Sequence, residues 1–408
     1  MKVINHCEVC NYQDLESVLN LGSFPLCDDL IPISSSRISM EYPIEILLCP
    51  QCLTAHQKYQ VPKIELFPKS YHYRSRFTAD VVDGMTQLVD SVNGLFKFDG
   101  LKGRKVLDIG SNDGTLLNIF RNSGAITIGI EPTDAALESE NMGHYIYQAY
   151  LDISLAEEIF STYGFLDVIT FTNVFAHIDD LPMLIESLNK LMGPNTLLVI
   201  ENHYLGAVLS QMQFDTFYHE HPRTYSAKSF TYIAESLGAR IIKVEFPKRY
   251  GGNIRIYISK ILKENSKTDL NRIIREEENL FFKDFVKMNK AIARYIAKTS
   301  ILINNLVLTY GMLPAKAFPG RAAILVKMLG LSDRQISAVY EKPGSKKIGN
   351  FLPGSRIPIK SDAELLATTN SLPIINLAWH IGPEIAEYLR SLGYNGKIIN
   401  IIDQDSFL

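Results

Sequence analysis

The stretch that decides the fold is Val106-Leu107-Asp108-Ile109-Gly110-Ser111-Asn112-Asp113-Gly114-Thr115-Leu116-Leu117. A short apolar run leads into a polar turn that contains two glycines, and apolar residues at helical spacing follow. This order predicts a buried strand, a tight turn and the start of a helix. It is the first half of a βαβ unit.

Outward from this stretch, short apolar runs alternate with helical segments. Strands are predicted over 126–130, 167–171, 196–200, 240–246 and 253–259. Strands that alternate with helices predict a parallel, doubly wound sheet. A preceding amphipathic helix is predicted from apolar residues at Val81, Val82, Met85, Leu88, Val89 and Val92. We therefore expect a Rossmann-like α/β domain over residues 66–265.

The last third of the chain repeats this alternation. A long helix is predicted from about 268 to 303, and strands are predicted over 306–310, 336–340, 374–379 and 397–402. Residues 266–408 are therefore expected to form a second doubly wound α/β domain. Residues 1–65, with short β-type stretches and Pro and Ser between them, are expected to form a small separate module.

Composition narrows the functional classes. The 408 residues are 46% hydrophobic and 21% charged, which excludes wholesale disorder. Lys plus Arg number 41 against 44 for Asp plus Glu, so the basic excess of nucleic-acid-binding proteins is missing and no such partner is expected. The longest stretch without charges, Leu365 to Pro383, is interrupted by polar residues, and Met1-Lys2 leads into no apolar leader. We expect a cytoplasmic enzyme without a membrane partner.

Four of the five cysteines form two C-x-x-C pairs, Cys7 with Cys10 and Cys49 with Cys52, and Cys27 is left over. Two such turns supply the closed tetrahedral sulfur shell that suits a structural zinc ion. The alternative is that the cysteines are buried or redox-active thiols. Paired C-x-x-C sequences in one small module favour zinc.

The turn after the first strand indicates the cofactor. A dinucleotide fingerprint would need glycine at positions 110, 112 and 115, but Asn112 and Thr115 stand there, which argues against NAD. Acidic residues in the turn would repel phosphates but can accept hydrogen bonds from a cationic aminoacyl group, and Glu131 can accept them from ribose hydroxyls. We therefore predict S-adenosylmethionine. Its predicted binding residues are Asp108, Gly110, Asn112, Asp113, Gly114, Glu131, Pro132 and Asn173.

Histidines near the predicted strand ends are candidates for proton transfer. His219 and His221 lie in the aromatic and polar segment 214–226, beside Tyr218 and Glu220. His177 directly follows the strand next to the cofactor turn, at the sheet edge where ligands bind. Histidine transfers protons near neutral pH. The alternatives are a structural loop histidine at 219 and a helix-capping or core histidine at 177.

These motifs together resemble the sugar C-methyltransferases that act on nucleotide-linked 4-keto-hexoses in deoxysugar biosynthesis. The resemblance covers essentially the whole chain. It is carried by the paired C-x-x-C module with Leu21-Gly22-Ser23-Phe24-Pro25-Leu26, I-G-S-N-D-G-T from Ile109, N-V-F-A-H from Asn173, Y-H-E-H from Tyr218, Y-G-G-N-I-R from Tyr250, and Phe351-Leu352-Pro353-Gly354-Ser355-Arg356-Ile357-Pro358-Ile359.

The resemblance implies a class I methyltransferase domain and a reaction in two parts. A base removes the proton next to the sugar ketone, and the enolate carbon then takes the methyl group of S-adenosylmethionine. His221 would be the base, and the sugar pocket would be lined by Tyr218, Glu220, His177 and Tyr71 or Tyr73. Arg255 and Lys316 could hold the diphosphate of the nucleotide sugar, and the alternative for each is an ordinary surface charge.

One segment departs from the family's pattern. The family carries G-Y-G-A-P-A-K-G, whereas this chain has Thr309-Tyr310-Gly311-Met312-Leu313-Pro314-Ala315-Lys316-Ala317. Bulkier residues and the missing glycine after Lys316 leave the nucleotide and the sugar open. Two alternative functions also stay open: an O- or N-methyltransferase acting on a sugar or capsule precursor, and a non-catalytic zinc-containing binding protein.

Overall fold

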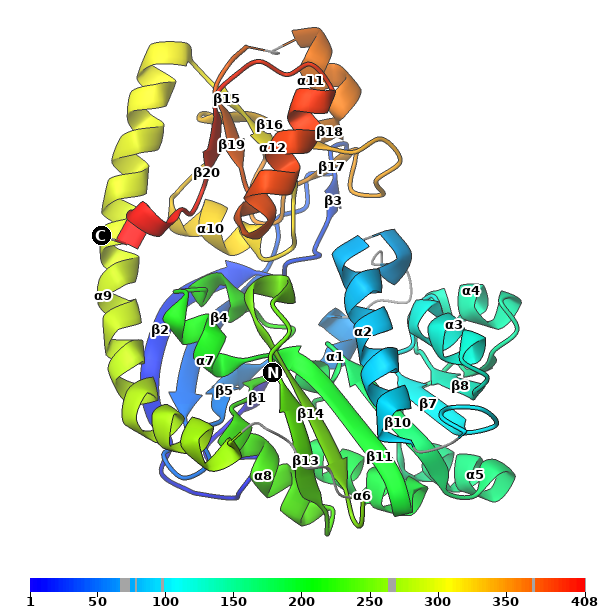
Figure 1. Cartoon of the computed structure of the whole chain (residues 1–408). Coiled ribbons are helices and arrows are strands. Elements are labelled where there is room, and N and C mark those ends of the chain that lie inside the picture. The colour runs from blue at the N-terminus through cyan, green and yellow to red at the C-terminus, as the bar shows by residue number, and fades with distance from the viewer. Residues whose placement is uncertain (67–73, 78, 97–98, 263–268, 369–370, 408) are drawn as a thin grey trace. The chain divides into compact units, whose positions relative to one another are not determined.

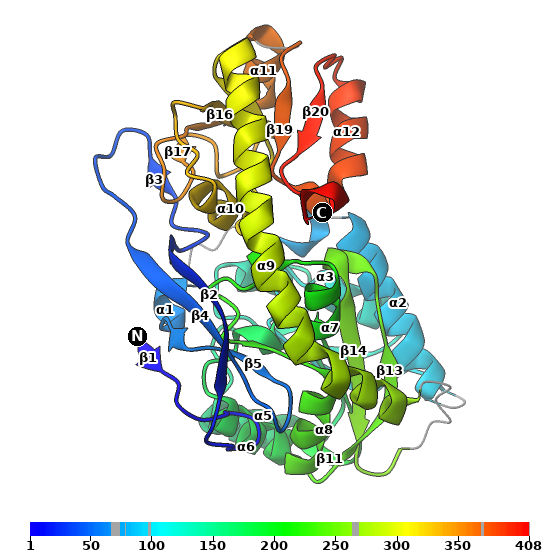
Figure 2. The same ribbon diagram turned by 90° about the vertical axis from the view of Figure 1, so that its left-hand side faces the viewer.

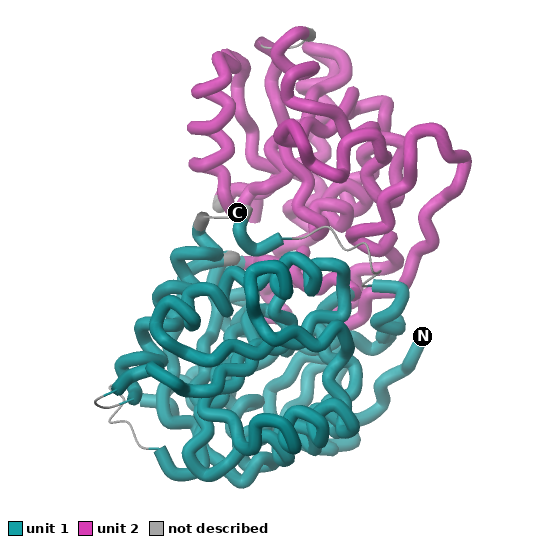
Figure 3. The backbone as a smooth tube through the Cα atoms, turned by 90° about the vertical axis from the view of Figure 1, so that its right-hand side faces the viewer, with its two compact units in different colours: residues 1–17, 47–211, 220–281 teal, residues 18–46, 212–219, 282–408 magenta. Residues whose placement is uncertain are grey.

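The computed structural model describes residues 1–66, 74–77, 79–96, 99–262, 269–368 and 371–407. The chain divides into two compact units, each assembled from three chain segments (Figure 3). Unit 1 is Met1–Ser17, Leu47–Gln211 and Glu220–Phe281, and unit 2 is Val18–Ile46, Met212–His219 and Phe282–Leu408. This division cuts across the three consecutive segments expected from the sequence. The physical reason is that Val18–Ile46 packs with the C-terminal residues, for example through the pairing of Ile31 with Phe351.

A seven-stranded sheet forms the centre of unit 1 (Figure 1). Its order is β13-β14-β11-β10-β7-β8-β9, with bounds β7 Lys105–Ile109, β8 Ile126–Ile130, β9 Tyr145–Tyr147, β10 Leu166–Thr172, β11 Met192–His203, β13 Arg240–Glu245 and β14 Asn253–Ser259. Strands β11, β10, β7, β8 and β9 pair in parallel, and β14 runs antiparallel to both of its neighbours, so β13 points in the same direction as the other five. The strand order changes direction at β7, so the gap between β7 and β10 is the topological switch point.

Helices cover both faces of this sheet. On one face, α2 (Ala79–Leu95) and α3 (Thr115–Asn122) pack over apolar residues of β7, β10 and β11. On the other face lie α5 (Ile153–Tyr163), α6 (Leu181–Leu191) and α8 (Ala227–Ser236). Two shorter helices, α4 (Ala135–Asn141) and α7 (Leu205–Ser210), follow β8 and β11. The doubly wound arrangement predicted from the sequence is confirmed.

Unit 2 contains a second parallel sheet of five strands (Figure 2). Its order is β18-β16-β15-β19-β20, with bounds β15 Leu313–Lys316, β16 Ile336–Glu341, β18 Ile359–Ser361, β19 Ile374–Asn376 and β20 Ile398–Asn400. The associated helices are α10 (Ala322–Met328), α11 (Asp362–Thr368) and α12 (Gly382–Ser391). Here the switch point lies between β15 and β19.

The strand predicted over 306–310 is wrong. These residues form the end of the long helix α9 (Leu270–Tyr310), which stops at Gly311 with a φ of 75°. A short β-type apolar run cannot be distinguished from a helix end by periodicity alone. Leu308 is 84% exposed, which a strand inside a core would not allow. The first strand of the second sheet starts instead at Leu313.

The remaining sheets have fewer strands. The largest has the order β12-β5-β4-β2, with bounds β12 Arg223–Thr224, β5 Ala55–Gln57, β4 Glu41–Leu48 and β2 Glu16–Pro25. Two small pairs join β1 (Lys2–Val3) to β6 (Tyr59–Gln60) and β3 (Ile31–Pro32) to β17 (Asn350–Phe351). The short helix α1 (Lys63–Leu66) ends the N-terminal segment. Among the described ranges, no helix combines the length and apolar character needed to cross a membrane.

Candidate active site and metal centre

The turn after β7 depends on two glycines in the left-handed region. Gly110 has a φ of 74° and Gly114 a φ of 79°. A Cβ at Gly110 would lie 2.4 Å from Val174 Cγ2, and one at Gly114 would lie 2.5 Å from Ser139 Oγ. The side chains of Val174 and Ser139 therefore already occupy the space beside these glycines, so no larger residue fits at either position without a shift of the turn. We call the turn from Gly110 to Gly114 the glycine cradle.

Glu131 fixes the same turn from the end of β8. Its buried carboxylate accepts hydrogen bonds from the backbone N–H of Asn112 (3.0 Å), from the N–H of Thr133 (2.9 Å) and from Thr133 Oγ1 (2.6 Å). Half-buried Pro132 separates Glu131 from Thr133 and starts the next loop. Each carboxylate oxygen has more than one acceptor site, so Glu131 could also receive ribose hydroxyls.

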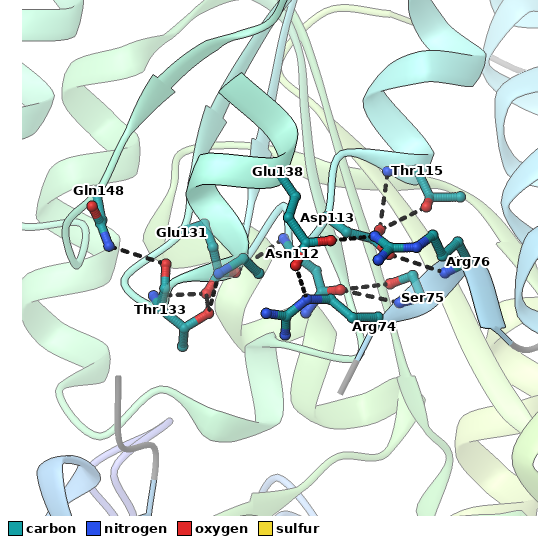
Figure 4. Close-up of polar contacts among 11 residues, drawn as sticks. Arg74, Ser75, Arg76, Asn112, Asp113, Thr115, Glu131, Thr133, Glu138 and Gln148 are labelled. Atoms are coloured by element: carbon teal, nitrogen blue, oxygen red, sulfur yellow. Dashed lines mark hydrogen bonds and ion pairs between the residues drawn. The ribbon is translucent and has the colours of Figure 1, made fainter. Parts of the chain in front are cut away.

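A second segment, Arg74-Ser75-Arg76, lies against this turn (Figure 4). Ser75 donates its backbone N–H to Asn112 Oδ1 (3.1 Å), and Arg76 donates backbone and guanidinium N–H groups to Asp113 Oδ2, both at 3.2 Å. Arg74 Nε donates to Glu138 on α4 (2.7 Å). Sequence reasoning missed these contacts, although the basic and aromatic character of residues 71–77 was a signal.

Asp108 is the buried carboxylate of β7. It accepts a hydrogen bond from Thr170 Oγ1 on the neighbouring strand (2.7 Å). Desolvation by burial, with the nearby charge of Glu131, raises the pKa of Asp108 to about 7, against the opposing hydrogen bond from Thr170. A cation bound beside Asp108 would favour the carboxylate and lower this pKa again.

Asn173 stands at the other side of the switch point. It has a φ of 55°, and its Oδ1 accepts a hydrogen bond from Asn253 Nδ2 (3.1 Å). Two buried hydroxyls near the turn, Ser111 Oγ and Ser139 Oγ, have no hydrogen-bond partner among the described residues. A buried hydroxyl without a partner is unfavourable until a ligand supplies one. The glycine cradle, the acidic residues and these hydroxyls fit S-adenosylmethionine.

Three histidines gather at the carboxyl ends of β10 and β11. The ring of His221 lies between two others, with centroid distances of 5.0 Å to His177 and 5.1 Å to His203. His177 is in the 3₁₀ turn η2 (Phe175–His177), and His203 ends β11. Sequence reasoning missed His203, although its position directly after a predicted parallel strand was the signal that had pointed to His177.

The His177 ring is oriented by the backbone. Its Nδ1 donates to the carbonyl of Glu220 at 2.6 Å, since a carbonyl oxygen can only accept. Burial lowers the pKa of His177, and the carbonyls of Glu220 and Asn173 partly oppose this. A lowered pKa keeps the imidazole neutral at neutral pH. Glu220 itself is buried, so its backbone helps to set the geometry of the histidine cluster.

The remaining predicted catalytic residues are distributed differently. Tyr218 and His219 belong to the segment Met212–His219 of unit 2. His219 Nε2 donates to the carbonyl of Tyr42 (3.0 Å), and burial lowers the pKa of His219 to about 4, which agrees with a structural loop histidine. Tyr71 and Tyr73 lie outside the described residues.

The two residues predicted to hold the diphosphate, Arg255 and Lys316, both contact protein acceptors in the structure. Arg255 is buried and donates to Glu201 Oε2 (2.7 Å), Glu245 Oε2 (2.9 Å) and the carbonyl of Gly84 (3.0 Å). The ammonium of Lys316, 1% exposed, donates to both oxygens of Asp362 (2.7 and 2.8 Å) and to the carbonyl of Tyr340 (3.1 Å). Protein acceptors therefore hold both cations, and contact with a diphosphate stays a prediction.

The sulfur atoms of Cys7, Cys10, Cys49 and Cys52 lie within 4.8 Å of one another. The two C-x-x-C turns have the same backbone geometry. Asn11 and Leu53, each one position past a pair, have φ values of 61° and 59° and donate their N–H groups to the carbonyls of Cys7 and Cys49, both at 2.9 Å. Each turn therefore directs two sulfurs to one point.

The buried thiols of this cluster are electrostatically coupled. Contacts with Cys49 raise the pKa values of Cys7 and Cys52, and burial adds to the effect, whereas hydrogen bonds from Cys52 and Cys7 lower the pKa of Cys49. A zinc ion would reverse this balance, because a coordinating thiol loses its proton. Four sulfur ligands leave no position for water, so the ion would be structural.

Three family models match consecutive parts of the chain. A "Putative zinc binding domain" matches residues 7–67, a "Methyltransferase domain" matches 78–244, and a "C-methyltransferase C-terminal domain" matches 248–402. The C-methyltransferase NovU of Streptomyces niveus is 25% identical over 405 residues, which are 97% of this chain and 94% of that protein. The chain is an S-adenosylmethionine-dependent C-methyltransferase with an N-terminal zinc module.

Two further similarities cover only part of this C-methyltransferase. The ubiquinone biosynthesis O-methyltransferase of Haemophilus ducreyi is 30% identical over 112 residues, covering 26% of this chain and 47% of that protein. The crystal structure of magnesium protoporphyrin IX methyltransferase from Synechocystis PCC 6803 with bound S-adenosylmethionine matches with a TM-score of 0.34 and 17% identity. It covers 45% of this chain and 82% of that one.

Proposed function

We propose that this C-methyltransferase acts on a nucleotide-linked 4-keto-deoxyhexose and that His221 removes the proton next to the ketone. The observation that carries the proposal is the histidine cluster at the carboxyl ends of β10 and β11 of a methyltransferase sheet, where the ring of His221 lies close to the rings of His177 and His203. Methyl transfer to carbon needs a base, since a C–H bond next to a carbonyl is only weakly acidic. The cluster supplies imidazoles at the sheet edge where ligands bind.

The cofactor would be held by the turn after β7. The glycine cradle would contact the aminoacyl part, Asp108 and Asp113 would face its ammonium group, and Glu131 would accept the ribose hydroxyls. Asn112, Pro132 and Asn173 would complete the pocket wall. S-adenosylmethionine supplies an electrophilic methyl group when it is bound.

The residues of the chain would carry the proton chemistry. His221 would take the proton from the carbon next to the ketone, and the electron pair of the broken C–H bond would pass into the enolate. His177, whose Nδ1 is held by the Glu220 carbonyl, would stay neutral and keep the His221 ring in place. Tyr218, Glu220 and one of Tyr71 and Tyr73 would line the sugar pocket, as in the family that the chain resembles.

The test separates deprotonation from methyl transfer. In heavy water with S-adenosylhomocysteine, the wild-type protein should exchange the proton next to the ketone of a nucleotide-linked 4-keto sugar. His221→Ala should lower both exchange and methylation by about 10²- to 10⁴-fold, the usual contribution of a general base. Binding of S-adenosylhomocysteine should be unchanged, and calorimetry measures it.

The control is His219→Asn, since His219 contacts the Tyr42 carbonyl and should not affect exchange. Full exchange and methylation by His221→Ala, with loss of both in His177→Ala, would transfer the role of base to His177. No methylation of any keto sugar, with methylation of a hydroxyl or amine of a related sugar, would favour the O- or N-methyltransferase alternative. The observation that favours this alternative is the partial similarity to an O-methyltransferase.

A further inference from the structure

The zinc module is bonded directly to the segment that carries His221. Strand β12, two residues after His221, pairs antiparallel with β5 of the module, with Arg223 opposite His56 and Thr224 opposite Ala55. The N–H of Gln57 donates to the carbonyl of Pro222 (2.9 Å). Just beyond β12, Ser226 Oγ donates to the carbonyl of Cys52 (3.1 Å). The zinc module and the segment that follows His221 therefore belong to the same β-sheet.

Arg223 is the centre of this connection. Its side chain is fully buried, and its guanidinium has three separate acceptors. Nη1 donates to the carboxylate of Glu8, Nη2 donates to the backbone carbonyl of Ile178, and Nε donates to Tyr225 Oη (3.0 Å). Ile178 directly follows His177. One side chain therefore fixes the segment of His177 relative to the segment of His221.

Glu8 connects Arg223 to the cysteine cluster. It lies inside the first C-x-x-C turn, between Cys7 and Cys10, and its side chain is 5% exposed. Besides Arg223, it accepts hydrogen bonds from Lys2 Nζ (2.6 Å) and Gln60 Nε2 (2.8 Å). The neighbouring ring of His56, also buried, places Nε2 at 3.3 Å from Cys7 Sγ. The chain of contacts thus runs from a zinc ligand to the carbonyl after His177.

We propose that Arg223 and Glu8 are positioning residues for the histidine pair, so that the metal-bound module holds His177 and His221 at their working separation. This proposal rests on the proposed role of these histidines. An arginine suits the task because its planar group can donate in three directions at once, which lysine cannot do. The zinc module would then serve catalysis through geometry, without contact between metal and substrate.

The experiment compares Arg223→Lys and Glu8→Gln with a matched control, Lys2→Ala. Lys2 also contacts Glu8, but its side chain is 60% exposed, so its removal leaves the buried pair intact. We expect the two test variants to keep about one zinc per chain and to bind S-adenosylhomocysteine normally. Their kcat should fall by about 10- to 100-fold with a smaller change in KM, as expected for misplaced catalytic groups. Lys2→Ala should behave as the wild type.

A structural readout does not depend on the substrate. Hydrogen exchange measured by mass spectrometry should become faster at residues 174–180 and 220–226 in both test variants, while the cofactor turn at 110–114 stays protected. The same two segments should respond when a chelator removes zinc from the wild-type protein. The hydrogen-exchange measurement tests the positioning role even if the substrate is not a keto sugar.

Two results would overturn the proposal. One is unchanged kcat in both test variants with full zinc content. The other is faster exchange spread evenly over unit 1, which would assign Arg223 and Glu8 to general stability. If Arg223→Lys does not fold, Glu8→Gln, which keeps the shape of the side chain, decides the question with the same two measurements.

Discussion

The central strands of the two doubly wound sheets, β7 and β15, end in similar backbone geometry but in different polar surroundings. β7 of unit 1 is followed by Gly110, and β15 of unit 2 is followed by Ala317, and both residues have positive φ, 74° and 62°. In unit 1 the turn is built on glycines, and the buried hydroxyls of Ser111 and Ser139 beside it have no hydrogen-bond partner in the described chain. In unit 2 the strand ends in Lys316, whose ammonium donates to Asp362 and to the Tyr340 carbonyl.

This difference shows that a topological switch point does not by itself make a binding site. The position is available in every doubly wound sheet, but the side chains decide whether it holds a ligand or an ion pair. After β7, carboxylates and unpartnered hydroxyls remain available to a ligand. At β15, the polar groups satisfy one another. Four substitutions test this contrast.

The largest effect is expected for Lys316→Met. It leaves Asp362, which is 2% exposed, without its cation, and breaking a buried pair in this way lowers the free energy of unfolding by about 3–5 kcal/mol. Thermal and urea denaturation measure the loss. Adding Asp362→Asn should recover part of it. Lys360→Met, which breaks an exposed pair with Glu364, is the control and should cost about 0–1 kcal/mol.

A folded Lys316→Met protein of normal stability with a raised KM for the nucleotide sugar would contradict this assignment. Lys316 would then contact the substrate, as the family resemblance implied.

Gly110→Ala should weaken S-adenosylhomocysteine binding by about 100-fold, or roughly 3 kcal/mol. Its Cβ would meet Val174 at 2.4 Å, so either the turn or Val174 must shift, which would disturb the proposed cofactor contacts. Calorimetry measures the dissociation constant. Gly103→Ala is a matched control, because Gly103 also has a positive φ, 71°, but open space around its Cβ position. Equal losses in both variants would show that backbone strain, and not the cradle, is responsible.

Cofactor binding should depend on pH through Asp108. The pKa of this carboxyl is raised to about 7, so it is mostly protonated at pH 6 and charged at pH 8. If the cofactor's ammonium group prefers the carboxylate, S-adenosylhomocysteine should bind about 10-fold more weakly at pH 6 than at pH 8. Asp108→Asn should remove this dependence. A pH-independent affinity in the wild type would place the ammonium group elsewhere.

Asp108 should make the stability of the protein depend on pH in the opposite direction to its cofactor affinity. The folded protein holds this proton up to about pH 7, whereas the unfolded chain loses it near 3.8, so the free energy of unfolding decreases as the pH rises through this window. Denaturation of the cofactor-free protein at several pH values, with Asp108→Asn as reference, measures the slope.

The smallest effect is expected for Ala317→Gly. Alanine in the left-handed region is strained, and glycine removes this strain at some loss of entropy, so the free energy of unfolding should rise by up to about 1 kcal/mol. The reverse change at a helix end, Gly311→Ala, should lower it by a similar amount, since Gly311 has a φ of 75°. Loss of stability in Ala317→Gly would mean that the alanine methyl group contributes packing beyond its strain.

The sequence was sufficient for most of the fold. Alternation of apolar runs and helical segments predicted both doubly wound sheets, and the spacing of Cys7, Cys10, Cys49 and Cys52 predicted the cluster that the structure assembles. The prediction of a strand over residues 306–310 was wrong because so short a β-type run does not reveal whether its apolar residues follow the period of a strand or of a helix. The interleaving of the two compact units could not be predicted, because pairing of distant segments leaves no local pattern in the sequence.

The site was predicted less completely, for a physical reason. Motifs identified residues that follow strands, such as His177 and Glu131. They could not show that Arg255 and Lys316 would be buried among acceptors, because a cation looks the same in sequence whether its partner is a carboxylate or a phosphate. The partners of Arg223 come from residues 8, 178 and 225, and no single stretch of sequence contains that combination.

The pairing of β5 with β12 also sets an order of events during synthesis. The ribosome releases all four cysteines early, but 175 residues separate Thr54 from its hydrogen-bond partner Ser229. The metal-binding turns can therefore close while the sheet that they belong to still lacks its edge strand. Contacts between such distant segments form late and slowly. A nascent chain that stops before residue 223 carries an assembled cysteine cluster with an unpaired strand edge, which is a surface for chaperones.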